Sequence, residues 1–362
     1  MSSWVKLPDE RVRMSGLSET SGEMRMQVAR LHGVADLRLS DEPVPAAGPG
    51  MSLVRVTAVG ICGSDLHWWA EAGIGDAVLD RPLVPGHEAA GIIDGGPRRG
   101  ERVAIDPAIA CGSCRECRSG YRNLCTRIRF AGHGSQDGAM REYLAWPSDL
   151  LHPLPDALTD ADGAMLEPLG VAIHAADLGH LRLGGSAVVA GCGPIGLLLI
   201  QVLRAAGAAR VAAFDPLPHR REAASRLGAD ITADPARAGG SAELRELTGD
   251  GVDVAFEMAG TDGGVQLAIA AARPGGRVVL GGIPGDDQTR FQASVARRKG
   301  LTIAMVRRMN ETYPRAIGLA ASGQADLHSL VSHRFPLAKA EDAFSAAARR
   351  TGLKVVIEPG KN

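Results

Sequence analysis

Four cysteines lie within fifteen residues of this chain, at Cys111, Cys114, Cys117 and Cys125. Thiolates at such short spacing can converge on one ion and complete a tetrahedral zinc site with no position left for a substrate. We therefore expect a closed zinc site that stabilises a loop and performs no chemistry. Disulfide bonding is the alternative, but the two other cysteines, Cys62 and Cys192, fall inside other motifs and leave no disulfide framework.

The length and composition predict a globular protein of two domains. A chain of 362 residues exceeds the size at which single cores stop growing. Its residues are 45% hydrophobic and 22% charged, with a formal net charge of −1, which gives no support to a nucleic-acid or acidic-membrane partner. No apolar run approaches the ~20 residues of a membrane span. The first ten residues contain no apolar segment of a secretory signal, so we expect a soluble cytoplasmic protein with reduced thiols.

The first half of the chain has the pattern of a β domain. Residues 1–23 are polar and without period, and we interpret them as a loose tail, or as the result of a start assigned too early, with Met24 as the true start. From 24 to 178, short β-type runs are broken by Gly, Pro and Asp, which indicates an irregular, largely antiparallel domain. The clearest runs are 53–59, 89–93 and 102–105.

The pattern changes near residue 180. From 179 to 312, apolar strands alternate with helices, which predicts βαβ units and a parallel sheet. The expected strands are 186–190, 211–214, 252–256 and 277–280, and the expected helices are 194–206, 220–227 and 265–272. Residues 313–362 form helical patterns and a final strand at 354–357, which we expect to return to the first domain. The fold class is α/β.

A glycine-rich turn follows the first strand of the second domain and opens its first helix. It reads Gly191-Cys-Gly193-Pro194-Ile195-Gly196, the pattern of a dinucleotide-binding turn. Its glycines allow a tight turn, close approach to a pyrophosphate and close helix packing, while the helix N-terminus offers free N–H groups. Asp215 ends the next strand, where an acid accepts the adenosine ribose hydroxyls. Together these features predict dinucleotide binding.

Asp215 also bears on the choice of cofactor. A carboxylate at this position repels a 2′-phosphate, so NAD is favoured over NADP. Arg220 and Arg221 are the alternative, because a nearby guanidinium can hold that phosphate. We interpret them as solvated residues in the first turn of the next helix, and retain Arg220 as a cofactor-binding candidate.

A second cluster of possible metal ligands lies near the N-terminus. Cys62, Ser64, Asp65 and His67 share one short segment, and His87-Glu88 follows after about twenty residues. A catalytic zinc needs about three ligands of N, S or O type and one open position. Each residue has an ordinary structural explanation alone, but these explanations weaken beside the cysteine run and the dinucleotide turn.

These motifs resemble the zinc-dependent medium-chain dehydrogenase/reductase superfamily over about residues 24–360. The similar segments are Cys62-Gly-Ser-Asp-Leu-His67, Gly86-His-Glu-Ala-Ala-Gly91, the four-cysteine run, Glu167-Pro-Leu and Gly191–Gly196. Within the superfamily the chain is most similar to sorbitol (L-iditol) and related polyol dehydrogenases. The resemblance implies a Rossmann doubly wound sheet, a GroES-like catalytic domain, NAD and two zinc ions per chain. It also implies a homodimer or homotetramer joined through the nucleotide-binding domains.

The resemblance further implies roles for individual residues. Cys62 and His87 would bind the catalytic zinc, and Glu88 or Glu167 would supply the carboxylate. Zinc would lower the pKa of a bound alcohol, with the proton leaving through Ser64, by way of the cofactor ribose, toward His67. Hydride would pass to NAD, while Asp65 would support the metal site.

The substrate is the least determined feature. Trp68, Trp69 and Phe130 are candidates to shape the pocket, with Glu167 and Arg307 or Arg308 as candidates to bond hydroxyls. Polyol relatives commonly have an aromatic residue where Arg308 stands, which leaves other polyols, sugar acids, cyclitols and vicinal diols open. A threonine dehydrogenase and a non-enzymatic NAD-binding zinc protein are the competing functions.

Overall fold

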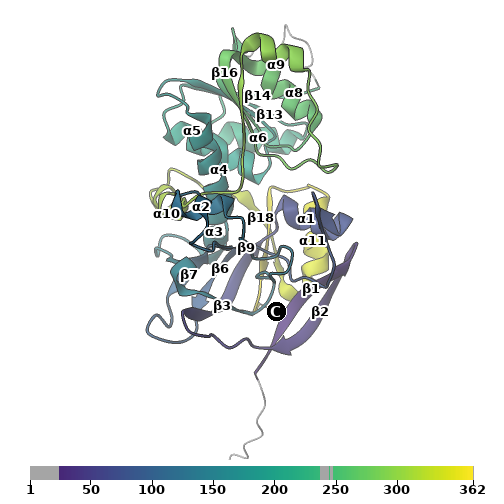
Figure 1. The fold of residues 1–362 in the computed structure, drawn as a ribbon, viewed down its shortest axis with the longest axis vertical. Coiled ribbons are helices and arrows are strands. Elements are labelled where there is room, and N and C mark those ends of the chain that lie inside the picture. Colours follow the sequence, from purple (N-terminus) through teal and green to yellow (C-terminus); the bar gives the residue numbers. More distant parts are fainter. Residues whose placement is uncertain (1–23, 237–243, 245–247, 362) are drawn as a thin grey trace, which may run out of the picture.

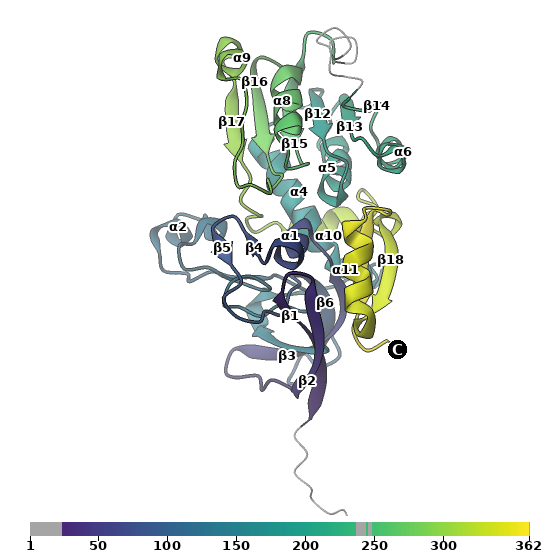
Figure 2. The same ribbon diagram turned by 90° about the vertical axis from the view of Figure 1, so that its right-hand side faces the viewer.

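The computed structural model describes residues 24–236, 244 and 248–361. The tail expected at 1–23 lies outside the described residues. Figure 1 shows two lobes, one formed by the middle of the chain and the other by both of its ends. The second lobe therefore contains the first strands and also the yellow C-terminal segment (Figure 2).

The middle lobe contains a parallel sheet of six strands. Its order is β14-β13-β12-β15-β16-β17. The first strand, β12, is central: β13 and β14 are added on one side of it, and β15, β16 and β17 are added on the other. The side chains of β12 explain its burial, because Ala187 and Val189 enter one core cluster while Val188 enters another. The strands are β12 (Ser186–Ala190), β13 (Arg210–Phe214), β14 (Ile231–Ala233), β15 (Val252–Glu257), β16 (Ala272–Leu280) and β17 (Thr302–Met305).

Helices cover both faces of this sheet, as the doubly wound fold requires. Leucines of α5 pack in the first core cluster, and the apolar side chains of α8 pack in the second. The helices of this lobe are α5 (Pro194–Ala205), α6 (Pro218–Arg226), α8 (Asp262–Ala271) and α9 (Ala293–Lys299). The predicted βαβ alternation and the parallel sheet are confirmed.

Two edge strands of this sheet, β14 and β17, were not predicted. Both are short and partly exposed, so neither shows the continuous apolar run of a central strand. These two strands form through their pairing with β13 and β16, which the local sequence does not reveal.

The other lobe is built on a seven-stranded sheet. Its order is β11-β7-β6-β3-β19-β18, with β10 paired to β3, and the pairs are antiparallel except β18 with β19. The strands are β3 (Met51–Gly60), β6 (Glu88–Ile93), β7 (Arg102–Ile105), β10 (Tyr143–Pro147), β11 (Leu151–Pro153), β18 (Val331–Pro336) and β19 (Lys354–Glu358). Strand β19, near the end of the described chain, pairs with β3 of this lobe.

Smaller elements complete this lobe. Its two-stranded pairs are β1 (Arg25–Gly33) with β2 (Asp36–Pro43), β4 (Gly73–Ile74) with β5 (Ala77–Val78), and β8 (Ala108–Ile109) with β9 (Arg129–Phe130). Its helices are α1 (Gly63–Glu71), α2 (Arg115–Arg118), α3 (Asp160–Ala164) and α11 (Ala340–Ala348).

Helix α4 (Leu166–Gly179) lies where the lobes meet (Figure 1), and packs on α5 and on α10 (Tyr313–Ala321). Its apolar side chains join the same core cluster as α5. Among the described residues, no helix combines the length and the apolar character needed to cross a membrane.

Candidate active site

Two strand ends bring the candidate metal ligands together. Cys62 follows β3 and is the N-cap of α1, while His87 immediately precedes Glu88, the first residue of β6. Because β3 and β6 pair with Gly60 opposite Glu88, the ends of the two strands lie side by side. The fold thus places residues from two separate motifs at one point.

The geometry of this cluster fits a zinc ion. One ligand atom from each of Cys62, His87 and Glu88 lies within 4.8 Å of the others. A sulfur, an imidazole nitrogen and a carboxylate oxygen form the mixed donor set of catalytic zinc sites, in which the fourth position takes water or substrate. These three residues can therefore hold the catalytic metal.

Asp65 fixes the orientation of His87. Its Oδ1 lies 3.5 Å from His87 Nδ1, and the carboxylate accepts hydrogen bonds from the Cys62 and Gly86 amides at 2.9 and 3.1 Å. Burial alone would raise the pKa of Asp65, but the His87 charge and these hydrogen bonds lower it. At His87, burial alone would lower the pKa, but the negative charge of Asp65 outweighs it, so the pKa of His87 rises well above its ordinary value. An ionised Asp65 that engages Nδ1 leaves Nε2 available to a metal.

Glu88 has a buried partner of opposite charge. Lys354 of β19 forms an ion pair with Glu88 Oε2, and the two residues are 2% and 1% exposed. Burial would lower the pKa of Lys354, whereas Glu88 raises it above its ordinary value. A Cβ at Gly60 would overlap the Glu88 carboxylate, so a glycine is needed where these strands approach. The Glu88 charge is thus shared between Lys354 and any metal at this point.

Glu167 approaches the same region from the first turn of α4. It is buried, and its carboxylate interacts electrostatically with His87 and Glu88. Burial raises the pKa of Glu167 to about 7, although His87 opposes this rise. Glu167 does not belong to the three-residue ligand cluster, so its role as a ligand stays a prediction.

The residues of the expected proton path lie along α1. Ser64 Oγ is 3.4 Å from His87 Nε2, at the metal cluster. One turn later, His67 Nδ1 lies 3.2 Å from Glu71 Oε1, and the His67 ring approaches Gly285 of the other lobe. Ser64 therefore lies at the metal cluster, and His67 lies farther along α1, toward the junction of the lobes.

The substrate candidates are placed differently from one another. Phe130 lies 5.1 Å from the His87 ring, between centroids, and therefore borders the cluster. Trp68 is only 2% exposed and packs with Leu31 and Leu83, which argues against the expected direct contact with a substrate. The side chain of Arg307 is exposed. The neighbouring Arg308 instead lies over Phe130.

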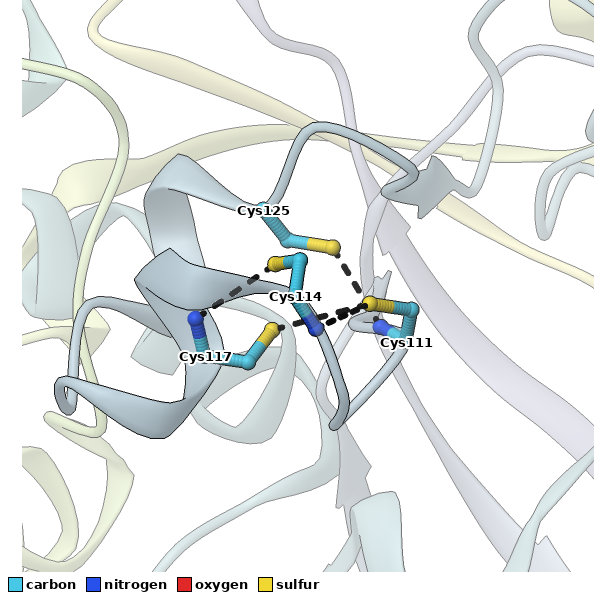
Figure 3. Close-up of side chains that lie close together, drawn as sticks. All are labelled: Cys111, Cys114, Cys117 and Cys125. Atoms are coloured by element: carbon cyan, nitrogen blue, oxygen red, sulfur yellow. Dashed lines mark hydrogen bonds between the residues drawn. The ribbon is translucent and has the colours of Figure 1, made fainter.

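The four predicted structural ligands converge in a loop of the lobe that is formed by both ends of the chain. Figure 3 shows the sulfurs of Cys111, Cys114, Cys117 and Cys125 directed toward a common centre. All four lie within 4.8 Å of one another, and the sulfurs of Cys111 and Cys117 are 4.0 Å apart. A tetrahedral site with Zn–S bonds of about 2.3 Å separates its sulfurs by about 3.8 Å. The loop is therefore shaped to hold zinc.

Backbone amides support thiolates in this loop. The amides of Cys114 and Cys111 donate to the sulfurs of Cys111 and Cys125, each at 3.3 Å. Hydrogen bonds from the Ser113 and Cys114 amides lower the pKa of Cys111 to about 5. The described residues include all six cysteines, and each of them is a free thiol, so the alternative pairing is not observed.

The glycine-rich turn forms one wall of a groove between the lobes, with a volume of about 910 Å³. Gly191 has φ of +101°, and a Cβ there would lie 2.7 Å from the Ala259 amide. A Cβ at Gly196 would collide with the Gly191 carbonyl, so a glycine is needed where the helix approaches the turn. Gly193 and Pro194 line the groove, whereas Ile195 packs against the core. These features fit a dinucleotide.

Asp215 is held at the ends of β12 and β13. Its Oδ2 accepts a hydrogen bond from the Cys192 amide and its Oδ1 accepts one from the Leu217 amide, both at 2.9 Å. The expectation of solvated arginines is wrong: Arg220 is largely buried, with Nη1 3.9 Å from Asp215 Oδ2, and Arg221 donates to the Asp215 carbonyl at 2.7 Å. The short loop after β13 folds both side chains back onto the strand end. Burial lowers the pKa of Arg220.

Sequence reasoning missed two residues of the site. Lys354 joins Glu88 only through the pairing of β19 with β3. His133 packs edge-on against Trp68 at 5.3 Å and also lies near Phe130. Lys354 belongs to the expected final strand and His133 lies outside the recognised motifs, but neither residue had a local signal for a role in the site.

Comparison with known proteins gives matches over nearly the whole chain. Residues 48–156 match the alcohol dehydrogenase GroES-like domain, and residues 194–322 match the zinc-binding dehydrogenase domain. Sorbitol dehydrogenase of Rattus norvegicus is 36% identical over 92% of this chain and 95% of its own length. Probable D-xylulose reductase A of Neosartorya fischeri is 35% identical over 90% and 95%. The structure of L-idonate 5-dehydrogenase from Escherichia coli has a TM-score of 0.86 at 27% identity, covering 92% of this chain and 98% of that one.

Proposed function

The chain belongs to the zinc-binding dehydrogenase family, and from this premise we propose that it oxidises a secondary alcohol of a polyhydroxylated substrate to a ketone, with reduction of NAD. One observation carries the proposal: Ile61 and Gly63, which flank the candidate metal ligand Cys62, line the dinucleotide groove. A metal at Cys62 and His87 would therefore lie beside the cofactor.

The residues of the site support this chemistry in distinct ways. When bound, zinc polarises the substrate hydroxyl and NAD accepts the hydride. Cys62 and His87 Nε2 would hold the metal, and Asp65 orients the imidazole through Nδ1. Ser64 Oγ, 3.4 Å from His87 Nε2, is placed to accept the hydroxyl proton while it releases its own proton, by way of the cofactor ribose, toward His67. His67 is placed to pass a proton toward solvent, with Glu71 beside it.

Polyols and sugar acids are the favoured substrates. Relatives whose names state a substrate include a sorbitol dehydrogenase, a D-xylulose reductase, an L-idonate 5-dehydrogenase and a 2R,3R-butanediol dehydrogenase. Three of these four names are of sugar alcohols, their ketoses or sugar acids, and the buried carboxylates near the cluster suit a hydrophilic molecule. None of these names supports the threonine alternative. The non-enzymatic alternative is not favoured, because Cys62, His87 and Glu88 form a complete donor set.

The test is a screen for NADH formation with sugar alcohols, sugar acids, cyclitols, vicinal diols and threonine, using zinc-replete protein. We expect turnover with at least one polyhydroxylated compound and with NAD. Turnover of threonine alone would replace the substrate class, and binding of NADH without any turnover would support the non-enzymatic function.

Three further features complete the proposal. Two zinc ions per chain are expected from the two clusters. Edge strand β17, whose Met305 is 67% exposed, supports a homodimer or homotetramer joined through the parallel sheets, which light scattering measures. Six free cysteines fit a reducing compartment such as the cytoplasm, which fractionation of expressing cells tests.

A further inference from the structure

Arg308 places a guanidinium next to the candidate metal cluster. It lies in the loop after β17, and its guanidinium carbon is 4.0 Å from the centroid of the Phe130 ring. The same ring lies 5.1 Å from the ring of His87. Arg308 and His87 therefore both contact one aromatic side chain at the edge of the cluster.

Two nitrogens of this guanidinium have no acceptor among the described residues. Nε and Nη1 of Arg308 are shielded from solvent and donate to no atom of the described residues. Glu167 and Asp106 attract the charge through space, but within the described ranges no carboxylate oxygen comes within 4.0 Å of it. Buried guanidinium groups are normally paired, because lost hydration must be replaced by hydrogen bonds. Nε and Nη1 of Arg308 are thus available to an added acceptor.

The backbone is held in an unfavourable conformation that gives Arg308 this position. Its φ is +55°, in the left-handed region that side-chain-bearing residues seldom adopt. The surrounding loop is anchored to the cysteine lobe, the segment from Cys111 to Cys125 that carries the four structural cysteines. There, Asn123 Nδ2 donates to the Arg307 carbonyl and Asn310 Nδ2 donates to the Gly120 carbonyl, each at 2.9 Å. Strained residues persist when their surroundings fix them, and they concentrate at functional sites.

We propose that Arg308 binds an anionic group, a carboxylate or a phosphate, at one end of the polyhydroxylated substrate. This inference rests on the proposed function and selects sugar acids or sugar-alcohol phosphates over neutral polyols. A hydroxyl group cannot neutralise a desolvated guanidinium, whereas an anion supplies charge and acceptor oxygens together. The competing explanation is that Arg308 serves only as a counter-ion for Glu167 and Asp106.

The kinetic test compares substrates that differ only at one end. Gluconate, sorbitol 6-phosphate and sorbitol share a hydroxylated chain, as do idonate and iditol. We expect wild-type kcat/KM for an anionic member to exceed that for its neutral partner by about 10-fold or more. The carboxylate and phosphate arms identify which anion is preferred. Equal or better use of every neutral partner would overturn the inference while leaving the proposed function intact.

Variants separate anion binding from a counter-ion role. Arg308→Gln should reduce the anionic-to-neutral ratio by about 10- to 100-fold, and Arg308→Lys should reduce it less, because the charge remains. The ratio is measured within one preparation, so partial unfolding cannot change it. Arg315→Gln is the matched control, since this exposed guanidinium of α10 pairs with Asp177 of α4 and should leave the ratio unchanged. An unchanged ratio in Arg308→Gln would show a counter-ion only.

A binding measurement keeps the inference testable without turnover. With the groove saturated by NADH, calorimetry with gluconate and with sorbitol 6-phosphate should detect binding of at least one to wild type, with loss in Arg308→Gln or weakening in Arg308→Lys. Binding of neither anion to wild type would overturn the inference. Absence of turnover with every substrate would instead overturn the proposed function.

Discussion

Asp65 Oδ1 lies 3.5 Å from Nδ1 of His87, a member of the candidate metal cluster, and both residues are buried. The carboxylate also accepts two backbone amides, so it cannot turn away from the imidazole without losing them. Such a contact selects the tautomer that presents Nε2 to a metal and increases its basicity.

Asp65→Asn should weaken zinc binding at the catalytic cluster. Loss of a carboxylate behind a ligating histidine typically costs about 10- to 100-fold in metal affinity. Competition with a chelator at fixed pH measures this, with Asp76→Asn, an exposed residue of the same lobe, as the control. Unchanged affinity would mean that Asp65 serves only in the capping box of α1, where its carboxylate accepts a hydrogen bond from the amide of the N-cap residue Cys62.

The two zinc clusters should respond differently to loss of one cysteine. Cys114→Ser should lower the metal content from two to one and reduce Tm by more than about 5 °C, because a structural zinc contributes directly to folding. Cys62→Ser should also lose one zinc, with Tm nearly unchanged. Cys192→Ala, a buried cysteine outside both clusters, should retain both ions. Metal analysis with thermal denaturation decides, and one zinc per wild-type chain would contradict this account.

Cofactor preference should depend on Asp215. We expect kcat/KM with NAD to exceed that with NADP by at least ~10-fold, because the carboxylate repels a 2′-phosphate. Asp215→Asn keeps an acceptor for the Cys192 amide and should relax the preference. Arg220, 3.9 Å from this carboxylate, is the competing determinant. Equal use of NADP by wild type, abolished in Arg220→Gln, would mean that the arginine prevails.

The Asp253 carboxylate should make stability depend on pH at the acidic end. The Ser186 amide and Arg273 donate to it at 2.9 and 2.8 Å, and these hydrogen bonds lower its pKa in the folded protein. A lowered pKa stabilises the fold above the unfolded value of about 3.9, and this contribution disappears as pH falls through the folded value. Asp253→Asn should therefore lower Tm at pH ~7, with a deficit that shrinks below pH ~4. A deficit independent of pH would contradict this assignment.

Local signals predicted much of the fold, and non-local pairing determined the rest. The turn Gly191–Gly196 and Asp215 could be located because strand, turn and acid follow one another at fixed spacing. The ion pair of Lys354 with Glu88 could not, since it forms through the alignment of β19 and β6 on either side of β3. The same holds for Arg308, whose placement depends on anchors in the distant cysteine lobe.

The central claim is that Cys62 and His87 hold the catalytic metal of an NAD-dependent polyol or sugar-acid dehydrogenase. It is tested most directly by the rate of NADH formation from a substrate of the wild type, compared with Cys62→Ser and His87→Ala, each confirmed to bind NADH. We predict turnover by the wild type and a loss of about 100-fold or more in both variants, because neither retains the metal that polarises the hydroxyl. Turnover near the wild-type rate in either variant would contradict the assignment.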